Sequence, residues 1–316
     1  MKTVAMALFP DFLLLDMAGP LEVFSIANRY LPPAQHYRIL ILGTESGPLR
    51  ASNGVMVQAD LLLEQALDAY DLLLVPGGPG AYNECHPALL PWLRAAVPRA
   101  RRFGSICTGA FVLGYAGLLD GHRVTTHWHY TERLIKAFPK AIVETDRIYL
   151  QDGRLITSGG VTAGIDLALS VVAQDHGKQV AVEVAKVLLV VMKRQGGQAQ
   201  FSPMTSAVAP QETPITRVQN HVLANLEQSF TVESMAALVD MSARRFARLF
   251  AKDVQMTPMA FLQGARIDRA RHLLETTELP LKTVAFHAGF GSVRHMRFLF
   301  SEKLGLTPTQ YRQQFS

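Results

Sequence analysis

Cys107 is the residue of this sequence whose setting is best suited to chemistry. It lies in the stretch SICTGA at 105–110, where an apolar run ends and small residues open a predicted helix. A nucleophile elbow has this form, because a strand, a sharp turn bearing the nucleophile and a helix must follow one another directly. The positive end of that helix is expected to lower the pKa of the thiol and to favour the thiolate.

A glycine-rich turn could complete such a site. PGGPG at 76–80 follows the apolar run DLLLV. Backbone N–H groups in a turn of this kind, including those of Gly77 and Gly78, can bind an anion or an oxyanion opposite the sulfur. Cys85 and Cys107 are the only cysteines, and their spacing suggests neither zinc nor a disulfide framework. We therefore expect no metal and no cofactor, and a reducing cytoplasm as the location.

The length of the chain predicts two globular domains. A sequence of 316 residues is too long for one ordinary core. No segment reaches the roughly 18 to 20 uninterrupted apolar residues of a membrane helix. The apolar N-terminus is interrupted by Pro10, Asp11 and Asp16 and lacks a cleavage site, so neither a membrane partner nor a signal peptide is expected.

The first 190 residues alternate short apolar runs with helical stretches. The runs are TVAMALF, YRILILG, DLLLV and FGSIC, and helices are expected near 20–30, near 87–101 and up to 117. This alternation predicts an α/β fold with a doubly wound, mainly parallel, flavodoxin-like sheet, whose functional residues lie at the carboxyl ends of the strands. RVTTHW and the hairpin RIYLQDGRLIT add strands, and a long helical stretch runs from 162 to about 194, with a break near 176–177.

Composition and charge change after this region. Residues 195–214 are rich in Gly, Gln, Ser, Thr and Pro, which is typical of a linker. Residues 1–213 hold 18 basic and 18 acidic side chains, whereas residues 214–316 hold 13 and 8. The whole positive excess lies in the last third, as expected for a domain that binds a phosphate backbone. The predicted domains are thus 1–194 and 215–316, joined by the linker 195–214.

The last third contains an internal repeat. MSARRFARLFAKDVQMTPMAFL at 241–262 aligns with GSVRHMRFLFSEKLGLTPTQYR at 291–312, at an offset of 50 residues. In each copy a Ser can cap one helix and a Thr-Pro pair can start the next. A short helix precedes each copy, which predicts two helix-turn-helix units. The long helix at 259–276 would let the two recognition helices enter successive major grooves, about 34 Å apart.

The same region, above all RIDRARHLLETTELPLKTVAFHAGFGSVRHMRFLFSEKLGLTPTQYR, resembles the AraC/XylS family over roughly 215–315. The resemblance implies an all-α domain that binds double-stranded DNA, with RNA polymerase as an additional partner. It also implies which positions face DNA: Arg244 and Arg248 on the first recognition helix, and Val293, Arg294 and Arg297 on the second. Arginine can bind guanine bidentately or pair with phosphate, and the sequence leaves this choice open.

Two positions depart from the family pattern. Phe298 stands where the family usually has Arg, and it either packs inward or touches a thymine methyl group. Gln255 stands where the second copy has Gly305. If this residue closes a helix in the left-handed conformation, Gln costs about 1 kcal/mol more than Gly.

The first domain resembles the ThiJ/PfpI superfamily over about 3–190, and most closely its isocyanide hydratases. The matching segments are LFPDFLLLDMAGPLEVF, LLLVPGGPG, SICTGAFVLGYAGLLDGHRVTTHW and SGGVTAGIDLAL. The resemblance implies that Cys107 is the nucleophile, Thr108 its neighbour and Asp16 a protonated acid. The implied ligand site adds Glu22, Gly77 and Gly78. Peptidases of the superfamily have a His after the cysteine, so Thr108 argues against peptidase or amidase activity.

The order of these two domains is that of the GlxA-like transcriptional regulators, which the chain resembles from end to end. The resemblance implies a homodimeric, ligand-responsive regulator that is not an enzyme, and whose cysteine site binds a small effector of the amine or amino-acid class. One alternative is a hydratase-like cysteine enzyme fused to a DNA-binding domain. Another is a redox sensor, because an exposed thiolate oxidises readily to sulfenic acid.

Overall fold

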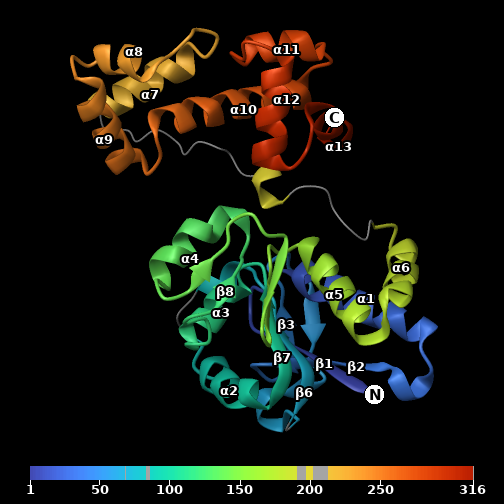
Figure 1. The fold of residues 1–316 in the computed structure, drawn as a ribbon. Coiled ribbons are helices and arrows are strands. Elements are labelled where there is room, and N and C mark those ends of the chain that lie inside the picture. Colours follow the sequence, from blue (N-terminus) through green and yellow to red (C-terminus); the bar gives the residue numbers. More distant parts are fainter. Residues whose placement is uncertain (68, 83–85, 191–196, 202–212, 316) are drawn as a thin grey trace. The chain divides into compact units, whose positions relative to one another are not determined.

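The computed structural model describes residues 1–316 except 68, 83–85, 191–196, 202–212 and 316. The chain divides into two compact units, Met1–Arg194 and Gln195–Ser316 (Figure 1). Of the predicted linker, 195–196 and 202–212 lie outside the described residues. The described part is not structureless, because it contains a 3-10 helix at Gln198–Gln200 in which Gln198 is buried. Ala199 packs against a core of the second unit, so this stretch belongs to that unit.

The first unit is built on a seven-stranded sheet in the order β10-β11-β7-β6-β1-β2-β5. The pairs are parallel except for the β10–β11 hairpin. The series β2-β1-β6-β7-β11 has the flavodoxin-like order, so the predicted doubly wound sheet is confirmed. The strands are β1 (Lys2–Leu8), β2 (Tyr37–Gly43), β5 (Leu61–Leu62), β6 (Tyr70–Val75), β7 (Ala100–Ile106), β10 (Tyr149–Asp152) and β11 (Leu155–Ser158).

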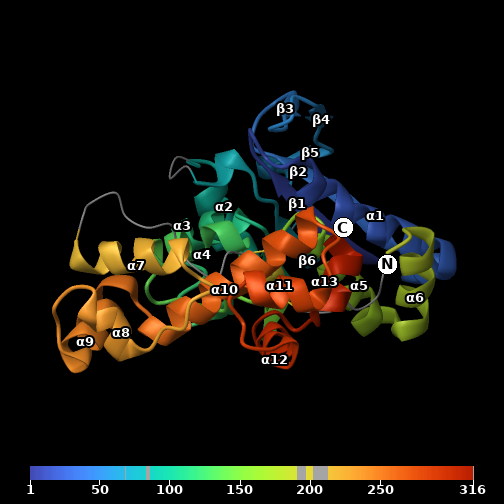
Figure 2. The same cartoon turned by 90° about the horizontal axis from the view of Figure 1, so that it is seen from above.

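Helices cover both faces of this sheet (Figures 1 and 2). One face carries α1 (Leu14–Ala27), α5 (Ala163–His176) and α6 (Lys178–Val187), and the other carries α2 (Leu89–Ala96) and α3 (Gly109–Tyr115). The predicted break between the last two helices of the unit is confirmed at Gly177, whose φ is 87°. Besides short 3-10 helices, the first unit also contains α4 (Thr131–Ala137) and two small two-stranded sheets, β3 (Pro48–Arg50) with β4 (Met56–Gln58) and β8 (Arg123–Val124) with β9 (Ile142–Val143).

The position of α1 differs from the prediction. A helix was expected near 20–30, yet the helix begins at Leu14 and Pro20 lies inside it. The proline is buried, and a Cβ at Gly164 on α5 would lie 3.0 Å from its ring. Close packing between α1 and α5 therefore outweighs the helix hydrogen bond that the proline cannot make.

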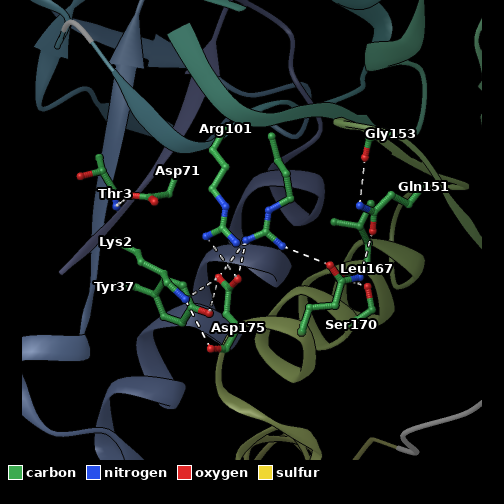
Figure 3. Close-up of polar contacts among 12 residues, drawn as sticks. Lys2, Thr3, Tyr37, Asp71, Arg101, Gln151, Gly153, Leu167, Ser170 and Asp175 are labelled. Atoms are coloured by element: carbon green, nitrogen blue, oxygen red, sulfur yellow. Dashed lines mark hydrogen bonds and ion pairs between the residues drawn. The ribbon is translucent and has the colours of Figure 1, made fainter.

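A buried ion network ties the amino ends of the strands to α5. The carboxylate of Asp175 is 1% exposed and accepts two hydrogen bonds from Arg102, at 2.7 and 2.8 Å. The Tyr37 hydroxyl donates to the same carboxylate at 3.1 Å, and the Lys2 ammonium lies 3.3 Å from it. Figure 3 shows Lys2, Tyr37 and Arg101 converging on Asp175 from separate elements. This network holds the end of α5 against the start of β1, β2 and β7.

The second unit consists of two three-helix groups joined by α10 (Pro258–Thr276) (Figure 2). The groups are α7 (Pro214–Ala224), α8 (Val232–Ala237) and α9 (Ala243–Val254), followed after α10 by α11 (Leu281–His287), α12 (Val293–Leu304) and α13 (Pro308–Phe315). Each group has its own apolar core. Phe261 and Leu262 of α10 belong to the first core, and Ile267, Ala270 and Leu274 belong to the second.

The structure confirms the predicted repeat. Ser242 and Ser292 cap α9 and α12 by accepting hydrogen bonds from the N–H groups of Arg245 and His295, at 3.4 and 3.1 Å. Thr257 caps α10 in the same way, and Pro258 is the first helical residue, as the Thr-Pro pair indicated.

Among the helices in the described parts of the chain, none has the length and hydrophobicity needed to span a bilayer.

Gln255 does close α9 in the left-handed conformation, with a φ of 60°. Gly305 occupies the same conformation after α12, at 70°. The Gln255 side chain donates a 2.7 Å hydrogen bond to the carbonyl oxygen of Lys252. Such a bond is worth about 0.5 to 1.5 kcal/mol, so it offsets much of the cost expected for Gln at this position.

Candidate functional site

The segments that follow β1, β6, β7 and β11 meet at the carboxyl edge of the sheet. These ends share an edge because the four strands are parallel. Five of the six residues predicted to bind a ligand come together there, namely Asp16, Gly77, Gly78, Cys107 and Thr108. The sixth, Glu22, does not join them. It is exposed on α1, about 120° around the helix axis from buried Asp16.

Cys107 has the strained backbone of a nucleophile elbow. Its φ is 57°, which costs a residue with a side chain about 1 to 2 kcal/mol. Its N–H donates to the Ser158 carbonyl oxygen at 3.0 Å, and its own carbonyl accepts from the Thr126 hydroxyl at 2.8 Å. The predicted strand, turn and helix are therefore present, and long-range hydrogen bonds hold the turn in place.

Gly160 is a site residue that sequence reasoning missed. Its φ is 86°, and a Cβ at this position would overlap the Cys107 side chain, lying 2.5 Å from Sγ. The next residue, Val161, also has a positive φ, 50°, and its N–H points at Asp16. The sequence did contain a signal for this site residue, because two consecutive glycines, Gly159 and Gly160, directly follow the strand 155–158.

Asp16 is fully buried, and both of its carboxylate oxygens accept backbone hydrogen bonds. The N–H of Gly77 donates to Oδ2 at 2.9 Å, and the N–H of Val161 donates to Oδ1 at 2.7 Å. Burial raises the pKa of Asp16 to about 6, although these two bonds and one from the Cys107 thiol act in the opposite direction. The expected rise in the pKa is thus present, and it brings the titration of Asp16 close to neutral pH.

This pKa predicts how stability changes with pH. Between about pH 4 and pH 6 the unfolded chain releases the Asp16 proton while the folded chain keeps it, so rising pH destabilises the folded state. Relative to Asp16→Asn, wild type should lose up to roughly 3 kcal/mol over this interval, at 1.36 kcal/mol per pKa unit. Urea unfolding of both proteins between pH 4 and pH 8 measures the difference. A constant difference would contradict the raised pKa.

The thiol of Cys107 differs from the prediction. Burial and the charge of Asp16 raise its pKa well above the ordinary value, although hydrogen bonds from Thr108 act in the opposite direction. The expected lowering is wrong because Cys107 is 6% exposed and sits next to a carboxylate, which outweighs the nearby helix end. An exposed thiolate, which the redox-sensor alternative requires, is absent at Cys107.

Slow alkylation should follow from this setting. Cys85 lies outside the described residues, so Cys85→Ser provides the background in which one thiol reports. At pH 7 we expect iodoacetamide to modify Cys107 at least about tenfold more slowly in folded protein than in urea, because the thiolate is the reactive form. The doubly substituted protein Cys85→Ser/Cys107→Ser corrects for other labelling. Equal rates in folded and unfolded protein would disprove the buried, neutral thiol.

The glycine-rich turn does not offer the donors that an oxyanion hole requires. The N–H of Gly77 is bonded to Asp16, and the N–H of Gly78 donates to the Thr108 hydroxyl at 2.9 Å. A Cβ at Gly77 would lie 2.6 to 2.7 Å from Thr108 and Asp16 atoms, which explains why a glycine is needed there. Both predicted donors are engaged within the protein, so neither is available to an oxyanion.

The predicted DNA-facing residues lie on α9 and α12. Arg244 and Arg248 are exposed one turn apart on α9, and Arg294 and Arg297 are exposed on α12. Val293 is half-buried and packs against the second core. Phe298 is 64% exposed, so inward packing, one of the two possibilities open for it, is wrong. In the repeat this phenylalanine occupies the place of Arg248, on the outer face of its helix.

Comparison with known proteins finds a match for each of the two domains. The sequence pattern of the DJ-1/PfpI family matches residues 2–174, more than half of the chain. The chain belongs to the DJ-1/PfpI family. A helix-turn-helix domain pattern matches residues 235–314, and the predicted fusion of a ThiJ/PfpI-type domain to an AraC-type domain is confirmed.

Named regulators are similar over nearly the whole of this DJ-1/PfpI chain. The HTH-type transcriptional regulator CdhR of Pseudomonas aeruginosa is 33% identical, over 96% of this chain and 90% of its own. The HTH-type transcriptional regulator GlxA of Rhizobium meliloti is 26% identical, over 99% and 96%. Isonitrile hydratase of Pseudomonas putida is 35% identical, over 56% of this chain and 74% of its own. The DJ-1/PfpI chain is therefore a transcriptional regulator with a DNA-binding helix-turn-helix domain, as the resemblance implied.

Proposed function

We propose that this regulator binds operator DNA through α9 and α12 and that a small effector at the Cys107 site changes this binding. The observation that carries the proposal is that the Cys107 thiol is buried and that the N–H donors beside it are already bonded. An enzyme-like Cys–Asp pair is intact, but its thiol is neutral and the neighbouring N–H donors are already bonded within the protein. A site in this state suits recognition of a ligand rather than its turnover.

The chemistry of the site supports an effector with a cationic group, as in the amine and amino-acid class. With a pKa of about 6, Asp16 can carry a negative charge near neutral pH, and Coulomb attraction to a cation is strong in a buried setting. The side chains of Cys107 and Thr108 supply the other contacts. Entry of a cation would replace the thiol hydrogen as the partner of the carboxylate.

Regulation requires that the effector distinguish two states of the protein. A ligand with equal affinity for the DNA-competent and the incompetent state shifts neither. We propose that the effector favours one arrangement of the domains within a cytoplasmic homodimer, and that RNA polymerase contacts follow from DNA occupancy. The coupling is reciprocal, so operator DNA must change effector affinity by the same factor.

Outward Phe298 suits an apolar contact with a thymine methyl group, and the arginines on α9 and α12 suit guanine or phosphate. The two half-sites are then read differently, because Arg248 and Phe298 occupy equivalent places in the repeat. The predicted operator contains two non-identical boxes.

The test uses the full chain and an operator selected from random duplex DNA. Thermal shift with arginine, carnitine, glycine betaine and simple nitriles identifies binders, because a ligand of the folded state raises the melting temperature. A binder should change operator affinity in wild type, and should lose its effect in Asp16→Asn with DNA binding retained. Turnover of an isocyanide by wild type but not by Cys107→Ser would instead make the protein an enzyme.

A further inference from the structure

The two helix-turn-helix units touch each other directly, in addition to sharing α10. The loop that follows α7 in the first three-helix group reaches the second group beside α11 (Figure 1). Arg266, near the middle of α10, donates from Nε and Nη2 to the Leu226 carbonyl oxygen, both at 3.2 Å. Its Nη2 also donates to the Gln228 carbonyl oxygen at 2.7 Å. One guanidinium thus holds two peptide groups of this loop.

The turn between α11 and α12 of the second three-helix group lies against the same loop. Gly289, between α11 and α12, has a φ of 81°, and a Cβ there would overlap the Leu226 carbonyl oxygen and lie 2.8 Å from Arg266 Nε. His287 Nδ1 lies 3.0 Å from a carboxylate oxygen of Glu227. The backbone at Gly289 in the second group therefore approaches the backbone at Leu226 in the first group as closely as a glycine allows.

Hydrogen bonds tie the loop itself to α7 in the first three-helix group. Asn225 donates from its side chain to the His221 carbonyl oxygen at 2.8 Å, which continues the end of α7. Gln228 donates its N–H to the Asn225 carbonyl oxygen at 2.9 Å and its side-chain amide to the Asn225 side chain at 3.0 Å. Residues 226–228 are thus linked to the end of α7 by hydrogen bonds as well as by the chain.

The helix α10 would not by itself fix the relative orientation of the two three-helix groups. α10 has 19 residues and is about 28 Å long, and the two apolar cores that it joins share no residue. Bending or twisting of α10 would move α12 relative to α9. Successive base pairs are rotated by about 35°, so a modest twist changes the spacing of half-sites that both helices can reach.

We propose that Arg266 is a positioning residue that, through residues 226–228, sets the spacing of the two DNA boxes that the protein accepts. The inference rests on the proposed operator binding. Arg266 needs no contact with DNA for this role, since it acts by holding α9 and α12 at one separation and one angle.

The experiment compares full-length wild type with Arg266→Met, which keeps the length of the side chain and removes the donors. Each protein is titrated with the selected operator and with versions that gain or lose one base pair between the boxes. In wild type a one-base-pair change misplaces a whole box and should weaken binding at least about tenfold. In Arg266→Met the penalty should fall below about threefold, and binding at the original spacing should weaken. His272→Met, at an exposed position on the same helix, should keep the wild-type penalty.

A second measurement does not depend on DNA. Spin labels at Lys252→Cys and Lys303→Cys, in a background with Cys85→Ser and Cys107→Ser, report the separation of α9 and α12. The distance distribution should be narrow with Arg266 and broader with Arg266→Met, and Arg266→Lys should recover part of the narrowing. An unchanged distribution, or an unchanged spacing penalty, overturns the inference. Failure of wild type to select any operator would overturn the proposed function instead, and the distance measurement would still decide the role of Arg266.

Discussion

Replacing Arg102 by Met should lower the free energy of unfolding of the first unit by about 3 to 5 kcal/mol, because it leaves the buried carboxylate of Asp175 without its main partner. The guanidinium is 7% exposed and bonds both carboxylate oxygens. Lys2 and Arg101 remain nearby, but their side chains are more exposed and neither makes a bidentate pair. Both tryptophans, Trp92 and Trp128, lie in this unit, so their fluorescence during urea unfolding measures the change.

A matched double variant separates the ion pair from simple packing. Arg102→Met/Asp175→Leu removes both charges and should recover most of the loss, because the apolar pair leaves no buried ion. Burial alone would raise the pKa of Asp175, but the charges of Arg102 and Lys2 hold it below the ordinary value. The stabilisation is therefore complete above the unfolded-state pKa and is lost as the pH falls through the lower folded-state value. A single-variant loss below about 1 kcal/mol would disprove the importance of the network.

Removing Arg244 and Arg248 together should weaken operator binding at least about a hundredfold at fixed salt, since each direct arginine contact is worth about 1 to 3 kcal/mol. Both side chains are exposed on one face of α9, so the double substitution leaves the first core intact. Titration of full-length protein with the selected operator gives the affinity, and circular dichroism checks that α9 still forms.

The dependence on salt distinguishes the two kinds of contact. If an arginine pairs with phosphate, its loss reduces the slope of log K against log salt by about 1, whereas a contact to guanine alters base preference at one position. Arg269→Ala, which removes a charge elsewhere on the same unit, is the control for general electrostatics. An affinity within about threefold of wild type for Arg244→Ala/Arg248→Ala would place DNA on another surface.

Features that depend on neighbouring residues in the chain were predicted well. Apolar runs of strand length gave the positions of β1, β2, β6 and β7, because such runs are buried on both faces of a parallel sheet. The caps at Ser242, Ser292 and Thr257 were also local, since a capping side chain bonds an N–H three residues away. The helix start at Pro20 was misplaced, because a contact with Gly164, far along the chain, decides how α1 packs.

The sequence by itself determined the order of elements, the repeat and the nucleophile elbow, because these are properties of local spacing and composition. It also carries the segments in which the chain resembles two families. Only the tertiary structure decided the state of the site. Whether the Cys107 thiol ionises depends on burial, on Asp16 from another element and on Gly160 from a third. Whether the N–H groups of Gly77 and Gly78 are available depends on Asp16 and Thr108. Solvation and Coulomb energies follow distances in space, so chain position alone does not reveal them.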